Sequence, residues 1–400
     1  MKGTARFCRL IVGLVLIFSG FVKLLVPVGT SLILKEYLEV FHLGFLSGGA
    51  LFLGIALAFT EFITGVALLL RLRIRIFAWV ALLLLALFTP LTLYLALFNP
   101  IEDCGCFGEA VHLTNWQTFF KNVILLPFAL LIFIFRKKIT EFRYPVSEWI
   151  FVALFAALGL WLPIRSTTVA PLQEFTPYKV GAEITPGTKV EDMPEYETVF
   201  IYEKDGVQQR FTLDSLPDFS WTYVDSETTE AIPRAAKASA ADFVIESPDG
   251  RDVTEELLSR RNLLLMTIYY PDKFLRSHTA DDICTLREKA AGQGMDFVLV
   301  APYLIDGLPE DMEKALADPK LLLTFNRSNG GVTRLEEGMI VRKWARFKAL
   351  SSKVDFNRHG SAELESIAAI NRQRVDLEGF LVVFILLCIV KFIVFYKKKE

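Results

Sequence analysis

The residues best suited to chemistry are two cysteines one residue apart, Cys104 and Cys106, with Gly105 between them. A disulfide needs Cα atoms about 4.4–6.8 Å apart. A straight strand would separate these two by about 6.6 Å, and glycine permits a turn that shortens the distance. A bridge that closes so small a ring should be strained, and strained, exposed disulfides have the oxidising potentials of labile or catalytic bonds.

Three interpretations of this pair remain open. The first is a redox-active dithiol. The second is a metal site formed by Cys104, Cys106 and His112, with Asp103 or Glu109 as a further ligand, because thiolates serve both chemistries. The third is a structural turn with two inert thiols. The sequence has no Cys-x-x-Cys-His haem signature and no recognisable nucleotide or flavin motif, so no cofactor is evident.

The other cysteines are single thiols. Five cysteines are an odd number and too few for a disulfide scaffold. Cys8 and Cys388 fall in apolar stretches, where a free cysteine behaves as a small apolar residue. Cys284 falls in an expected helix and is interpreted as a buried structural thiol rather than a resolving cysteine. The lone His278 marks the start of that helix rather than a catalytic base.

Long apolar stretches must position these residues. The hydrophobic fraction is 53% and the mean hydropathy is +0.41. A helix needs about 20 apolar residues to cross a hydrocarbon core about 30 Å thick. Six stretches qualify or nearly do, and the first is interpreted as an uncleaved helix rather than a signal peptide. They are Phe7–Val28, Ala50–Leu70, Ile74–Phe98, Trp116–Phe135, Ser147–Pro163 (the shortest) and Leu377–Tyr396.

Charge sets the expected orientation. The formal net charge is −2 and no basic stripe interleaves with aromatics, which excludes nucleic-acid binding.

Lys and Arg gather at the start of the chain, in the turn at 71–75 and in the loop at 136–143, so these segments are expected in the cytoplasm. The terminal Lys397, Lys398 and Lys399 then also face the cytoplasm. We therefore expect a bacterial plasma-membrane protein with both chain ends in the cytoplasm. Cys104, Cys106 and the region 164–375 are then periplasmic or extracellular.

Two ionisable residues fall inside the apolar stretches. Lys23 and Glu61 would each cost at least about 2.5 kcal/mol as isolated charges at the bilayer centre. Counted from the ends of their stretches, they differ in depth by about 10 Å. One interpretation is a charge pair that lines a polar cavity beneath the cysteines, where a quinone or proton enters. The other is that Lys23 extends to the headgroups while Glu61 is held neutral by a neighbouring helix.

The region between the fifth and sixth stretches should fold outside the bilayer. Short β-favouring segments with turns such as Asp205-Gly206 indicate a β-rich or linker-like start. Beyond it the pattern predicts alternating strands and helices, ending in a hairpin. The expected strands are 243–246, 263–270, 297–301, 331–335 and 339–343, and the expected helices are 278–291 and 309–317.

The N-terminal third resembles the DoxX-like and MauE-like membrane family. The residues that carry the resemblance are Asp103–Gly108, Leu113–Gln117, Ser19, Gly20, Lys23, Leu24, Glu61 and Gly65. The resemblance implies a DoxX-like four-helix core and a role for Cys104 and Cys106 in thiol redox chemistry. MauE proteins are implicated in methylamine utilisation, where they help a thioredoxin-like partner to make or handle disulfides. We use methylamine here only as a family label.

The order of elements after residue 242 resembles the thioredoxin fold, in particular its peroxiredoxin-like and TlpA-like branch. Where that family has its Cys-x-x-Cys, this chain has Tyr270-Pro271-Asp272-Lys273, and the cis-proline position is Gly330 or Gly331. The resemblance therefore implies a degenerate module that binds a partner or shields the Cys-Gly-Cys segment.

The expected fold class is a membrane all-α bundle of six spans with an extracytoplasmic α/β thioredoxin-like domain. The expected divisions are 1–140 (four-span domain), 141–165 (fifth span), 166–240 (β-rich lead-in), 241–355 (thioredoxin-like domain), 356–376 (linker) and 377–400 (sixth span with basic tail).

Three functional hypotheses follow. The first is a membrane thiol–disulfide oxidoreductase, whose Cys104 and Cys106 exchange disulfides with an exported thiol protein or a thioredoxin-like carrier and pass electrons to a membrane quinone or another protein. Oxidases of this kind commonly use a second cysteine pair, which this chain lacks. The second is a non-enzymatic scaffold whose thioredoxin-like domain holds a client. The third is metal handling.

Overall fold

Six helices are long and apolar enough to cross a membrane. The computed structural model describes residues 2–101, 104–139, 145–184, 196–204, 207–211, 222–230, 243–351, 354–356 and 361–396. Within these residues the spanning helices are α1 (Lys2–Leu25), α3 (Ala50–Leu70), α4 (Ile74–Phe98), α5 (Asn115–Phe135), α6 (Pro145–Thr168) and α12 (Ala362–Tyr396). The prediction of six spanning helices is confirmed. Glu102, Asp103, Arg143, Asp205-Gly206, Asp242 and Lys397–Lys399 lie outside the described residues.

The first span ends earlier than the sequence suggested, and a further helix follows it. Helix α1 stops at Leu25, and α2 (Pro27–Val40) begins directly after Val26. Proline fits the first position of a helix because its missing N–H has no partner there, whereas inside a helix it breaks the hydrogen-bond ladder. A 3-10 helix, η1 (Gly44–Gly49), then leads into α3.

Glycines bring α1 and α3 into close contact. A Cβ added to Gly20 would lie 2.5 Å from the carbonyl oxygen of Ala58, and one added to Gly65 would lie 2.5 Å from the backbone nitrogen of Ile17. Both distances are shorter than real Cβ contacts, so only glycine allows this approach. Small residues at such positions are the usual means by which membrane helices pack.

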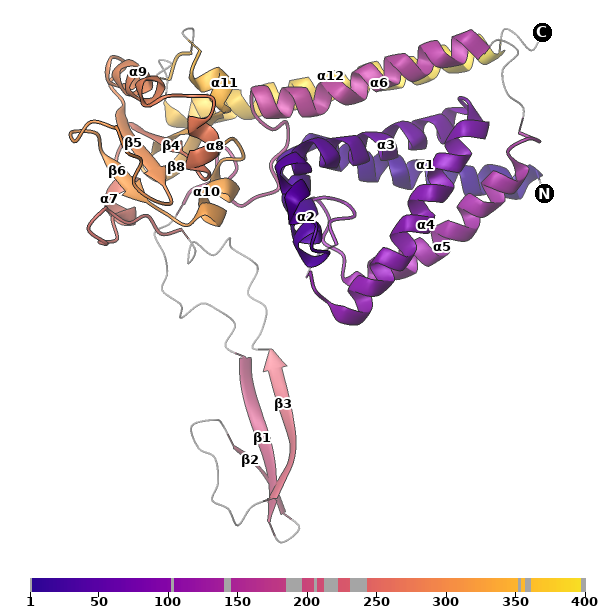
Figure 1. Cartoon of the computed structure of the whole chain (residues 1–400), viewed down its shortest axis with the longest axis horizontal. Helices are drawn as coiled ribbons and strands as arrows, with labels where there is room; N and C mark the ends of the chain where they lie inside the picture. Colours follow the sequence, from indigo (N-terminus) through magenta and orange to yellow (C-terminus); the bar gives the residue numbers. More distant parts are fainter. Residues whose placement is uncertain are drawn as a thin grey trace.

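Helices α6 and α12 run side by side from the bundle to the C-terminal domain (Figure 1). Arg165 of α6 donates to Asp376 of α12 at 2.8 Å. Helix α6 is longer than predicted, and Pro163 lies inside it. Helix α12 begins at Ala362, so the segment expected to be a linker is largely helical.

The C-terminal sheet domain, residues 243–356, is built on a five-stranded mixed sheet. The strand order is β6-β5-β4-β7-β8, in which β4, β5 and β6 are parallel while β7 and β8 are antiparallel to their neighbours. The strands are β4 (Leu263–Thr267), β5 (Asp296–Ala301), β6 (Lys314–Leu316), β7 (Gly331–Glu336) and β8 (Met339–Trp344). The helices are α7 (Thr254–Leu258), α8 (Pro271–Leu275), α9 (Ala280–Ala291), α10 (Pro319–Phe325) and α11 (Arg346–Ala349).

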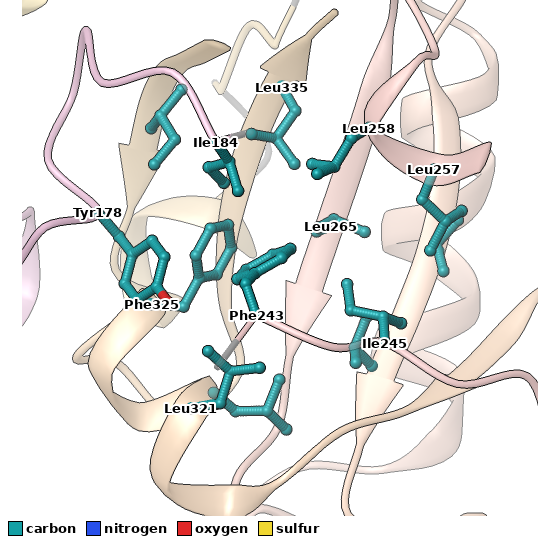
Figure 2. Close-up of a cluster of buried hydrophobic side chains, with 14 of the residues drawn as sticks. Tyr178, Ile184, Phe243, Ile245, Leu257, Leu258, Leu265, Leu321, Phe325 and Leu335 are labelled. Atoms are coloured by element: carbon teal, nitrogen blue, oxygen red, sulfur yellow. The ribbon is translucent and has the colours of Figure 1, made fainter. Parts of the chain in front are cut away.

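Successive residues of the central strand serve opposite faces of the sheet, as the two-residue period of a strand requires. Leu263 and Leu265 pack with α7 and α10, while Leu264 and Met266 pack with α8, α9 and α11. Figure 2 shows the first of these clusters, in which the rings of Tyr178, Phe243 and Phe325 meet 5.4–5.7 Å apart. The domain is therefore a sheet covered on both faces by helices.

Two predicted elements were wrong. Residues 309–317 do not form a helix, because 314–316 pair with β5 as β6 and the helix α10 begins only at Pro319. Asp318 caps α10 by accepting from the backbone N–H of Lys320 at 2.7 Å. Residues 243–246 do not form a continuous strand, and only Glu246 makes isolated bridges, to Asp252 and Leu316. The hairpin and the strand at 297 are confirmed, and the strand predicted for 263–270 is present but ends at Thr267.

A separate antiparallel sheet lies between the membrane helices and the sheet domain in sequence. Its order is β2-β1-β3, formed by β1 (Tyr196–Lys204), β2 (Val207–Phe211) and β3 (Thr222–Glu230). This agrees with the β-rich start predicted for residues 166–240.

Candidate functional site

The Cys-Gly-Cys loop, residues 99–114 between α4 and α5, holds both candidate cysteines as free thiols. Cys104 is buried and Cys106 is half-buried. Gly105 lies between them at φ +63°, and a Cβ there would lie 2.6 Å from Cδ1 of Ile33 on α2. Glycine is thus required twice, for its left-handed backbone and for the close approach of α2.

Three helices hold the loop through its cysteines. The Tyr37 hydroxyl of α2 donates to the carbonyl oxygen of Cys104 at 2.9 Å. The Thr118 hydroxyl of α5 lies 3.0 Å from the Cys104 sulfur. The Ser19 hydroxyl of α1 lies 2.7 Å from the carbonyl oxygen of Cys106. The positions of both cysteines therefore depend on residues 14 to 87 positions away in sequence.

The two thiols differ in proton affinity. A hydrogen bond between them, followed by burial, raises the pKa of Cys104 far above its ordinary value. The same hydrogen bond lowers the pKa of Cys106 to about 6, and the nearby cations of Lys121 and Lys23 act in the same direction. The pair therefore favours a thiolate on Cys106 that accepts a hydrogen bond from a protonated Cys104. The thiolate is the nucleophilic form of cysteine.

Lys23 and Glu61 form a buried ion pair beneath the loop. The lysine nitrogen lies 2.9 Å from both carboxylate oxygens, and each side chain is less than a tenth exposed. The Ser19 hydroxyl also lies 2.7 Å from Glu61 Oε2, so its single hydrogen serves either Glu61 or the Cys106 carbonyl at one time. A polar chain thus connects the intramembrane charges to the cysteine loop.

A largely apolar cavity of about 300 Å³, which we call the loop cavity, joins these groups. Both cysteines, the ion pair and Lys121 lie in its wall, whose remaining lining is mostly Leu, Val, Ile and Phe. This volume lies at the lower end of the range for small-molecule sites, about 300–1,000 Å³. The cavity can therefore hold an apolar ring against the two sulfurs.

The described residues do not group the side chains proposed for the alternative metal site. Among the described residues, no three His, Cys, Asp or Glu side chains are grouped so that they could hold a metal ion, so Cys104, Cys106 and His112 do not come together as ligands. His112 is exposed, and Asp103 lies outside the described residues.

The remaining cysteines lie apart from the pair. Cys8 is buried where α1, α4 and α5 meet, and Cys388 of α12 packs beside the cluster formed by α1, α3 and α6. Cys284 is partly buried against the α9 face of the sheet domain. His278 precedes α9 and stacks on Phe274.

The sequence missed two residues of the site. Tyr37 lies on α2, which was not predicted. Lys121 occupies an apolar stretch, as Lys23 does, so its charge was an available signal. Its ammonium lies 4.5 Å from the ring centroid of Phe107.

The sheet domain rests against the membrane bundle beside this loop. Arg327, in the turn between α10 and β7, forms an ion pair with Glu109, three residues after Cys106. Lys35 of α2 lies 4.9 Å from the ring centroid of Tyr270. Tyr270, which immediately precedes α8, therefore faces α2.

Comparison with known protein families identifies the region that contains the loop. Residues 1–135 match the family model of the methylamine utilisation protein MauE. The MauE-like region therefore comprises α1 to α5, both cysteines and the Lys23–Glu61 pair. A second family model, described as a domain of unknown function (DUF8463), matches residues 196–230, which span β1 to β3. No curated protein and no solved structure matches the chain.

Proposed function

We propose that this membrane protein is a thiol–disulfide oxidoreductase whose reacting groups are Cys106 and Cys104. The observation that supports the proposal most strongly is the unequal proton affinity of two neighbouring thiols in the wall of an apolar cavity. An inert structural turn has no need of a nucleophilic thiolate, whereas disulfide exchange requires one.

The exchange passes through a mixed disulfide on Cys106, which is the less buried of the two residues. In the oxidising direction, a thiolate of an exported protein attacks Cys106 of the disulfide form. The bond between the two cysteines breaks, and Cys104 leaves and takes up a proton. A second thiol of the partner loses its proton and attacks the mixed disulfide, which releases the oxidised partner and the Cys106 thiolate. The pair has then gained two electrons.

A membrane quinone fits the loop cavity as the acceptor of these electrons. The apolar walls would accommodate its ring, and the Lys121 ammonium is a donor for one of its carbonyl oxygens. When bound, a quinone would supply a two-electron, two-proton oxidant. The Lys23–Glu61 pair and Ser19 would hold charge and a proton beside the sulfurs. The outward position of the loop in a bacterial plasma membrane, with both chain ends in the cytoplasm, is supported by the distribution of Lys and Arg.

A scaffold function is the second candidate. The contacts Arg327–Glu109 and Lys35–Tyr270 place the sheet domain beside the loop, and its thioredoxin-like interpretation makes it a module that holds a client there. In this case the cysteines would be structural.

Serine substitutions separate the two candidates. C104S should accumulate mixed disulfides formed when its Cys106 thiolate attacks a disulfide of an exported protein, because Cys104 is no longer present to attack the mixed disulfide and release the partner. C106S should lose at least nine-tenths of these adducts, and C284S, the matched control, should behave as the native protein does. The adducts are measured by non-reducing electrophoresis and mass spectrometry after acid quenching. If the C104S/C106S double variant folds and retains all native adducts and client binding, the redox proposal fails and the scaffold remains.

A further inference from the structure

A second cavity lies where the membrane bundle meets the sheet domain. This junction cavity, about 230 Å³ in volume, is lined on the membrane side by Val26, which separates α1 from α2, and by Ser166 near the end of α6. On the other side it is lined by Arg327, Lys343 and Arg346. It is distinct from the loop cavity, whose lining includes none of these residues.

The charge of the lining is unbalanced. Arg327, Lys343 and Arg346 line the cavity, and two of these cations are paired, Arg327 with Glu109 and Lys343 with Glu174. Among the described residues Arg346 has no carboxylate within ion-pair distance, so one positive charge is left over. Glu174 accepts a hydrogen bond from Lys343 at 3.0 Å. Burial lowers the pKa of both Lys343 and Arg346, because these cations have lost water without gaining enough negative charge. The cavity therefore favours an anion.

Unused hydrogen-bond donors accompany this charge. Three residues of the lining have a buried side-chain N–H without a partner, namely Nε of Arg327, Nε1 of Trp344 and Nε of Arg346. Trp344 is only 3% exposed. Buried donors are nearly always satisfied in folded proteins, so three in the lining of one cavity indicate a missing acceptor.

The level of the cavity in the membrane suggests the source of that acceptor. Helix α1 ends at Leu25 and α6 ends at Thr168, so the cavity lies where two spans leave the hydrocarbon core. Lipid phosphate groups occupy this level. Phe347 of α11 also lines the cavity and is 62% exposed, so a large apolar surface adjoins the cationic lining.

We propose that the junction cavity binds the phosphate group of an anionic phospholipid, with Arg346 and the Trp344 N–H as its main ligands. Free phosphate would satisfy the same donors, so the test must distinguish the two sources.

Native mass spectrometry of the full-length protein in detergent tests this proposal. Equal concentrations of phosphatidylglycerol, phosphatidylcholine and inorganic phosphate are added separately. We expect one tightly retained phosphatidylglycerol, with phosphatidylcholine retained at least tenfold less. R346Q should reduce phosphatidylglycerol retention about tenfold. K348Q is the matched control, because it removes an exposed cation from the same short helix outside the cavity.

Several results would overturn the proposal. Equal retention of the two lipids, or equal losses in R346Q and K348Q, would exclude a specific headgroup site. Retention of inorganic phosphate without phosphatidylglycerol would exclude the lipid. If R346Q does not fold, W344F is tested in its place, because it removes one donor and keeps an aromatic ring. Unchanged retention of phosphatidylglycerol by W344F would refute the site.

Discussion

The most testable property of a single residue in this chain is the acidity of Cys106. Its pKa of about 6 means that about half of the thiol is ionised at pH 6, whereas an ordinary cysteine with a pKa of about 8.5 is almost fully protonated there. We expect the alkylation rate of Cys106 to rise with a midpoint near pH 6. At that pH the rate should exceed that of free cysteine at least tenfold, after allowing for the weaker intrinsic nucleophilicity of an acidic thiol.

Iodoacetamide labelling of the reduced protein, followed by peptide mass spectrometry, measures this rate across pH. K121Q provides a test of the cause, because removal of the Lys121 charge should move the midpoint to higher pH. A midpoint at the ordinary value in the native protein would rule out the thiolate on which the exchange mechanism depends.

At the residue scale the sequence selected the candidate cysteines but did not predict the contacts around them. The spacing of Cys104 and Cys106 around a glycine was sufficient to select the loop. The ion pair of Lys23 and Glu61 stayed one of two alternatives, because depths counted from the ends of the spans separated the two residues. Helix packing and the long lysine side chain bring the charges to 2.9 Å. That information resides in tertiary contacts and not in either helix alone.

Among the elements, the contact between α1 and α3 gives the clearest expectation. G20A should destabilise the protein by about 1–3 kcal/mol, because the added methyl group meets backbone atoms of Ala58 and Phe62, which cannot move aside as a side chain can. The change should appear as a lower unfolding temperature in detergent. This temperature is measured by size-exclusion chromatography of samples heated to a series of temperatures.

G379A is the matched control for this substitution. Gly379 also lies within a spanning helix, but a Cβ there would meet no atom within 4 Å. Alanine has a higher helix propensity than glycine by about 1 kcal/mol, so this variant should be neutral or slightly stabilised. Equal loss of stability in both variants would show that close helix packing at Gly20 is not the cause of the stability loss in G20A.

Apolar length predicted the spanning helices well and missed what lies between them. The predicted bounds of α3 and α4 match the structure, since both stretches are almost entirely apolar and end at arginines or at Asn99. Helix α2 was not predicted, because its 14 residues are too short to span a membrane and mix polar with apolar types. It is held in place by the bundle, which places Tyr37 over the cysteines.

At the scale of the whole molecule, the ion pair between Arg327 and Glu109 connects two regions that are 218 residues apart in sequence. E109Q should weaken this connection, because it leaves a buried arginine without its counter-charge. A loss of 1–2 kcal/mol would make amide exchange in the loop 104–113 about 5- to 30-fold faster. Hydrogen–deuterium exchange with mass spectrometry measures the exchange rate of this loop.

E337Q is the control for this comparison, since Glu337 pairs with Arg261 at the surface, where both side chains are more than half exposed. Exposed ion pairs contribute little, so loop exchange should not change. If E109Q also leaves loop exchange unchanged, the sheet domain does not stabilise the cysteine loop. The sequence does not predict the contact between Arg327 and Glu109, because neither residue is unusual within its own segment.

The continuous helix α12 has a consequence for how the molecule is assembled. Its 35 residues extend for about 52 Å, well beyond a hydrocarbon core of about 30 Å. Near its start Glu365 pairs with Arg334 of the sheet domain, and farther along Asp376 pairs with Arg165 of α6. Each residue inserted between these two acids would turn one of them by about 100° around the axis relative to the other. The number of residues between them thus sets the angular position of the sheet domain above the bilayer.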